Sequence, residues 1–128
     1  MYQVSNMTKV TIFYDNNLIA GFSMSGHANY NKSGQDIVCA SLSTASIMTI
    51  NGILDWIGLD YDEVVNANQE EGYLKIMLER EFYESIVVQQ LYKAFLMFLS
   101  ELATTYPENV SYDENKKHEV NEYDNSNS

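Results

Sequence analysis

Apolar side chains alternate with polar ones along the first part of the chain, which is the spacing of half-buried β-strands. This pattern predicts a strand over residues 8–15 and a second over residues 18–25. The turn signal Asp-Asn-Asn stands between them, and these residue types tolerate tight hairpin turns. The two strands are therefore predicted to form a hairpin, with one face built by Val10, Ile12, Tyr14, Leu18, Ala20, Phe22 and Met24.

Two later segments have the apolar spacing of helices. Residues 26–35 are polar and rich in Gly and Asn, and are predicted to form a loop. A helical stripe follows and ends at Gly58, a C-cap residue. Its start is open, because Asp36 or Ser41 could be the N-cap, and residues 37–39 could be an extended entry. A second helix is predicted over residues 83–104.

Shorter elements complete the predicted fold. Strands are expected at residues 60–66 and 73–79, and a last short strand at 110–112. The order ββαββαβ predicts an α+β fold in which a mixed, largely antiparallel sheet packs against two helices. Residues 1–113 form the single predicted domain, and residues 114–128 are predicted to be a flexible acidic tail, because they offer little apolar surface to bury.

Charge and cysteine content exclude several classes of function and predict where the protein acts. The 128 residues carry 18 acidic and 7 basic side chains, a net charge of −11, which argues against nucleic-acid binding. No run of about 18 apolar residues and no signal-peptide pattern is found, so a membrane role is not expected. A single cysteine permits no internal disulfide, which predicts a cytoplasmic protein. With two distant histidines, neither a metal site nor a cofactor is predicted.

Candidate chemistry is concentrated between residues 25 and 43. His27 follows the second strand, and Cys39 is expected near the first turn of the first helix. A neighbouring imidazolium and a helix N-terminus both lower the pKa of a thiol, so this pair suits nucleophilic catalysis. Gly26 and Gly34 flank the loop and would let it move. The spacing alone leaves open that Cys39 is a small buried apolar residue and that His27 is an ordinary loop residue.

A family resemblance bears on that choice. The chain resembles the bacterial ribosomal-processing cysteine proteases, the Prp family, in Gly26-His27-Ala28, Gly34, Asp36-Ile37-Val38-Cys39-Ala40 and Ser43. The resemblance covers roughly residues 8–113. It implies that His27 and Cys39 are the catalytic pair, that the loop between them is mobile and covers the site, and that the enzyme is a homodimer. It also implies the substrate, a large-subunit ribosomal protein precursor whose N-terminal extension is removed after an apolar, aromatic-rich stretch.

Two further residues match the family pattern as supporting residues. Asp36 could orient His27 or cap the helix, and these roles are compatible. Ser43 lies four residues after Cys39, on the same predicted helix face. Two other functions remain open: a non-catalytic binding module for a basic ribosomal protein, with Cys39 buried and inert, and a redox sensor in which Cys39 is oxidised reversibly.

Overall fold

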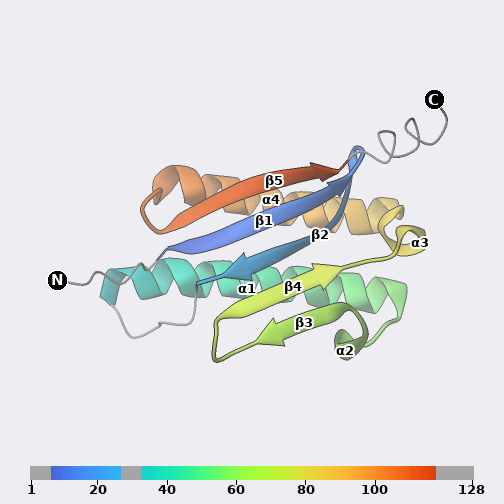
Figure 1. Ribbon diagram of the computed structural model, residues 1–128, viewed down its shortest axis with the longest axis horizontal. Helices are drawn as coiled ribbons and strands as arrows, with labels where there is room; N and C mark the ends of the chain where they lie inside the picture. The colour runs from blue at the N-terminus through green and yellow to red at the C-terminus, as the bar shows by residue number, and fades with distance from the viewer. Residues whose placement is uncertain (1–6, 27–32, 118–128) are drawn as a thin grey trace.

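The computed structural model describes residues 7–26 and 33–117, which form one sheet covered on one face by two long helices. The strands are β1 (Thr8–Asp15), β2 (Leu18–Ser25), β3 (Val65–Asn68), β4 (Tyr73–Met77) and β5 (Val110–Lys117). Their order across the sheet is β3-β4-β2-β1-β5 (Figure 1). Only the β1–β5 pair is parallel, so the predicted mixed, largely antiparallel α+β fold is confirmed.

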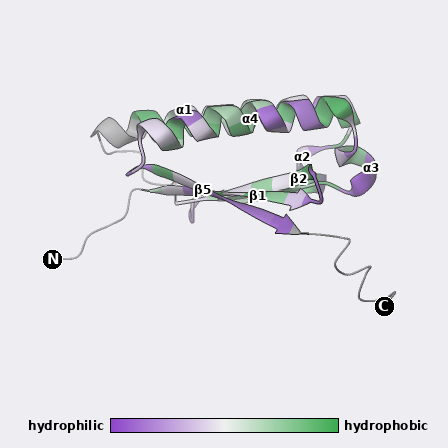
Figure 2. Ribbon diagram, turned by 90° about the horizontal axis from the view of Figure 1, so that it is seen from above, coloured by the Kyte–Doolittle hydropathy of each residue, from purple (hydrophilic) through white to green (hydrophobic). Residues whose placement is uncertain are grey.

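The long helices α1 (Ser33–Ile57) and α4 (Ile86–Thr105) lie side by side on the same face of the sheet (Figure 2). Their inner faces and the inward side chains of β1, β2 and β4 form the core. At its centre Phe22 of β2 stacks on Phe95 of α4, with ring centroids 4.3 Å apart. Burial of this apolar surface is the main stabilising contribution to the fold.

Close contact between strands requires a glycine in β2. A Cβ atom placed on Gly21 would lie 1.9 Å from the carbonyl oxygen of Ile76 in β4, far inside any allowed contact. Any side chain at this position would force the two strands apart.

Both long helices also meet a length and composition criterion for crossing a membrane, over Ile37–Ile57 and Ile86–Thr105. The sequence prediction concerned unbroken apolar runs, and no such run of about 18 residues occurs in either helix. The criterion instead averages hydropathy over a window, and the Ser and Thr residues within α1 lower that average only slightly. In the observed fold the buried faces of both helices serve the core beneath them.

The predicted strand over residues 60–66 is wrong in its first half. Asp60 is instead the N-cap of the short helix α2 (Tyr61–Val64), and strand β3 begins only at Val65. The side chain of Glu63 accepts a hydrogen bond from the Asp60 backbone N–H at 2.8 Å, which forms a capping box. The Asp-x-x-Glu spacing is the sequence signature of this box, and it outweighs the strand pattern here.

The second predicted helix, over residues 83–104, corresponds to α4, which begins three residues later than predicted. A short helix, α3 (Arg80–Tyr83), precedes α4. Ser85 separates the two, because its hydroxyl accepts hydrogen bonds from the N–H groups of Val87 and Val88 and acts as the N-cap of α4. Trp56 at the end of α1 also donates to this hydroxyl, at 3.1 Å, so the same residue joins the two long helices.

The last strand is longer than predicted. β5 runs to Lys117, in parallel register with the whole of β1, so residues 114–117 belong to the sheet and not to the predicted tail. Side chains reinforce this pairing: the hydroxyl of Tyr14 donates to Glu114, and the Lys116 ammonium lies 4.4 Å from the Tyr14 ring centroid. The rest of the predicted tail, residues 118–128, lies outside the described residues.

Candidate active site

Cys39 lies on the buried face of α1, with only 3% of its surface exposed. Since α1 begins at Ser33, Cys39 is the seventh residue of the helix and lies in its second turn. The sequence prediction placed it near the first turn. The helix dipole acts chiefly within the first turn, so its effect on this sulfur is weaker than the sequence prediction assumed.

The sulfur contacts the start of the central strand β1. The Oγ1 atom of Thr8 lies 3.4 Å from Sγ of Cys39, within hydrogen-bonding distance for sulfur, and Thr8 is fully buried. The backbone holds Thr8 in place, because its N–H donates to the Asn109 carbonyl at 2.8 Å. A hydroxyl group fixed by the sheet therefore faces the only cysteine of the chain.

His27 lies outside the described residues, but the residue before it is placed. Gly26 follows β2 with φ +87°, a conformation that favours glycine, and a Cβ atom there would lie 2.6 Å from the carbonyl oxygen of Met7. The same Cβ position is 3.9 Å from the Cα atom of Thr8. The chain therefore leaves β2 towards His27 beside the residue whose hydroxyl contacts Cys39, at one end of the sheet.

The supporting residues from the sequence pattern lie on α1. Gly34 and Asp36 belong to its first turn, so residues 33–35 of the predicted loop are helical. Neither Asp36 nor Ser41 is the N-cap, and residues 37–39 are helical, so all three proposed starts of this helix are wrong. Ser43 is half-buried one turn after Cys39, and its carbonyl accepts a hydrogen bond from the Ser46 hydroxyl at 2.8 Å.

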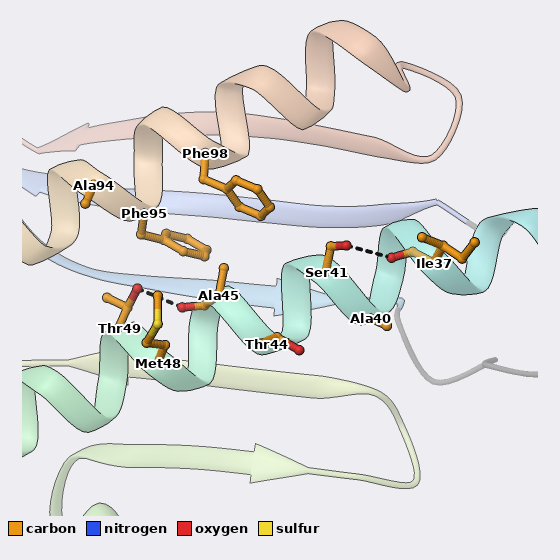
Figure 3. Close-up of a pocket in the computed structure, with 10 residues that line it drawn as sticks. All are labelled: Ile37, Ala40, Ser41, Thr44, Ala45, Met48, Thr49, Ala94, Phe95 and Phe98. Atoms are coloured by element: carbon orange, nitrogen blue, oxygen red, sulfur yellow. Dashed lines mark hydrogen bonds between the residues drawn. The ribbon is translucent and has the colours of Figure 1, made fainter.

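A pocket of about 670 Å³ lies between the two long helices. Its lining includes Ile37 and Ala40, which stand on either side of Cys39 in the sequence. Figure 3 shows Phe95 and Phe98 of α4 directed towards α1 across this pocket. The lining is mostly apolar but includes three hydroxyl-bearing residues; it consists of Ile37, Ala40, Ser41, Thr44, Ala45, Met48, Thr49, Ala94, Phe95 and Phe98. Its outer residues Ile37 and Met48 are 73% and 70% exposed.

Within residues 7–26 and 33–117, no cluster of three or more His, Cys, Asp or Glu residues could hold a metal ion.

Comparison with known proteins identifies the family. The family model described as cysteine protease Prp matches residues 7–111, which include the whole region from β1 to the start of β5. The chain belongs to the Prp family. This match spans both residues of the predicted catalytic pair, His27 and Cys39.

Individual relatives and solved structures agree with this assignment. The ribosomal processing cysteine protease Prp of Bacillus subtilis is 30% identical over 79 residues, which are 62% of this chain and 65% of the relative, just under two thirds of its length. A crystal structure from Streptococcus mutans is 28% identical, with a TM-score of 0.78, covering 87% of this chain and 96% of the other. Staphylococcus aureus Prp with a covalently linked product peptide is 26% identical, with a TM-score of 0.67, covering 87% and 100%.

Thr8 is a residue of the candidate site, in contact with Cys39, that the sequence analysis did not single out. The sequence did indicate that Thr8 is buried, because it lies two residues before Val10 and four before Ile12 and so faces the same side of β1 as these core residues. A hydroxyl at a core-facing strand position requires a hydrogen-bonding partner. The partner could not be named from the sequence, because 31 residues separate Thr8 from Cys39.

Proposed function

We propose that this chain is a cysteine endopeptidase that removes the N-terminal extension from the precursor of a large-subunit ribosomal protein. The observation that carries the proposal is the Prp family match across the region that holds His27 and Cys39. The Bacillus subtilis relative is named as a ribosomal processing protease, and Staphylococcus aureus Prp binds a product peptide covalently. Both names support peptide cleavage through a covalent step.

In the proposed reaction His27 takes the proton of Cys39, and the sulfur attacks the scissile carbonyl. The tetrahedral intermediate collapses to a thioester between Cys39 and the extension, while His27 protonates the departing amine of the mature protein. Water, deprotonated by His27, then hydrolyses the thioester, releases the extension as a carboxylic acid and restores the thiol. No metal or cofactor takes part in these steps.

The burial of Cys39 sets a requirement on this mechanism. At 3% exposure the sulfur does not meet a peptide carbonyl in the described conformation, so substrate binding has to uncover it. Asp36 and Ser43 are proposed as supporting residues of the reaction, because both match the family pattern and lie within four residues of Cys39 on α1. Their substitution is expected to slow cleavage without removing it.

The same burial favours one other function, a binding module for a basic ribosomal protein in which Cys39 is inert. The net charge of −11 suits a basic partner in either case, because complementary charge speeds encounter. Labelling of the native protein separates the two functions. If the chain is a protease, Cys39 becomes accessible in the native protein and reacts with iodoacetamide. If Cys39 is an inert core residue, it reacts only after denaturation.

The direct test is cleavage of the ribosomal protein precursor, followed by mass spectrometry. Cys39→Ala is expected to abolish cleavage and keep the fold, since it removes only the thiol group from a buried position. His27→Ala is expected to lose most of the rate. Ser46→Ala, a matched change at another buried position of α1, is the control and should cleave at the wild-type rate. Full activity of Cys39→Ala would refute the proposal.

We further propose that the enzyme is a homodimer and acts in the cytoplasm, where ribosomal proteins are made. The support is the outer surface of α1, where residues 37–54 contain no charged side chain in a strongly acidic protein. Its exposed apolar residues and the pocket beside them form a surface that a second copy can cover without charge repulsion. Direct contact with nucleic acid or a membrane is not part of the proposed reaction.

A further inference from the structure

We propose that Thr8 is a positioning residue for the reaction, because its hydroxyl donates a hydrogen bond to the sulfur of Cys39 when the thiol has lost its proton. This inference rests on the proposed protease function and assigns a role to a residue of β1, outside the His-to-Cys segment that carries the family pattern. The geometric basis is the 3.4 Å separation between Oγ1 of Thr8 and Sγ of Cys39.

The backbone of Thr8 is held by its neighbours at the start of β1. Thr8 pairs with Val110 of β5, and its N–H is bonded to Asn109. Gly26 packs against the Met7 carbonyl on the other side, where no Cβ atom could fit. Because strands on both sides fix the backbone of Thr8, its side chain meets the sulfur in a defined position and loses little entropy on binding it.

The direction of this hydrogen bond follows from the chemistry of the sulfur. In the neutral pair either group can donate. A thiolate has no proton, so once His27 has taken the proton the Thr8 hydroxyl is the donor. Hydrogen bonds to charged acceptors are about twice as strong as neutral ones, and burial strengthens them further. Thr8 therefore stabilises the reactive form of Cys39 more than the resting form.

The competing explanation is that Thr8 is structural and only satisfies a buried polar group. Both explanations predict some loss of stability when the hydroxyl is removed. They differ in how Cys39 reacts at different pH values. A change in access to the sulfur alters the alkylation rate by one factor at every pH, whereas loss of a bond to the thiolate moves the pH–rate profile along the pH axis.

The experiment measures alkylation of the native full chain by iodoacetamide across a pH series, with folding checked by circular dichroism. Since the chain has one cysteine, the rate reports a single site. Thr8→Val keeps the branched shape and removes the hydroxyl. We expect its rate at neutral pH to fall about tenfold and its profile to move to higher pH. Thr8→Ser, which keeps a hydroxyl, is expected to restore the wild-type profile.

Thr11→Val is the matched control, because it makes the same change on the opposite face of the same strand and should leave the profile unchanged. If Thr8→Val does not fold, Thr8→Ala removes the same hydroxyl and carries the test. A folded variant without the hydroxyl that keeps the wild-type profile would overturn the inference. That result is distinct from failure of the protease proposal, which would appear as wild-type protein that does not cleave the precursor.

Discussion

Gln89 is the buried polar residue that joins α4 to the rest of the fold. Its side chain accepts a hydrogen bond from the N–H of Ile19 at 2.9 Å and donates to the Ile19 carbonyl at 2.8 Å. It also donates to the carbonyl of Tyr83 at 2.7 Å. One side chain therefore satisfies three backbone groups in a region closed to water, where unpaired groups are costly.

We expect Gln89→Leu to lower the free energy of unfolding by about 3 kcal/mol, because these backbone groups lose their partners without gaining water. Gln90→Leu makes the same change at the neighbouring exposed position and should alter stability by less than about 0.5 kcal/mol. Urea denaturation of both variants provides the comparison. Equal effects of the two substitutions would contradict the role assigned to Gln89.

At the site, sequence reasoning proposed His27 and Cys39 as the catalytic pair but did not predict the surroundings of Cys39. The residue types and the family pattern were enough to single out His27 and Cys39. The position of Cys39 in the second turn and its contact with Thr8 were not predicted. Both depend on where α1 begins and how it lies on β1, which are long-range features that local patterns do not contain.

At the scale of elements, Tyr92 connects α4 to the sheet. Its hydroxyl donates to the carbonyl of Ala20 at 2.9 Å, and the residue is 1% exposed. Burial raises the pKa of Tyr92 well above its ordinary value of 10.0, because the ionised form would lie in an apolar environment. The folded state therefore keeps the proton at a pH where the unfolded chain releases it.

This difference predicts a loss of stability at alkaline pH. The contribution of Tyr92 is complete below pH 10 and decreases as the pH rises further, because ionisation then favours the unfolded chain. Tyr92→Phe should cost about 1 kcal/mol at neutral pH through the lost hydrogen bond, and this cost should shrink above pH 10. Urea unfolding at several pH values measures it, with Tyr61→Phe at an exposed position as control. A cost that does not change with pH would contradict the assignment.

The elements differ in how far local sequence determines them. The alternation of apolar and polar residues predicted β1 and β2 with the observed bounds. The two strands are neighbours in the chain and pair with each other, and most of their core residues alternate, although Ile19 of β2 is buried as well. The strand predicted at residues 60–64 is wrong, because a capping box forms a short helix there. Alternation also failed for β5, whose polar residues 113–117 show no strand pattern. Parallel pairing with β1, about 100 residues away, makes that segment a strand.

For the whole molecule, the uncharged outer face of α1 leads to a prediction about assembly. In the proposed homodimer Met48, which is 70% exposed and lines the pocket, is covered by the second copy. Met48→Glu would place a carboxylate in that apolar contact and should weaken dimerisation roughly hundredfold. Ile86→Glu, the same kind of change at a position that is 84% exposed and lies outside the pocket, should leave dimerisation unchanged. Sedimentation equilibrium measures both, and a wild-type monomer would refute the proposed dimer.

The central claim is that Cys39 forms a covalent bond to the extension that is removed. Mass spectrometry of the intact chain, acid-quenched during reaction with the precursor, tests it most directly. The account predicts an adduct whose added mass is that of the extension less one water, located on the peptide that contains Cys39. Cleavage of the precursor with the adduct on another residue, or undiminished cleavage by Cys39→Ala with no adduct at all, would contradict it.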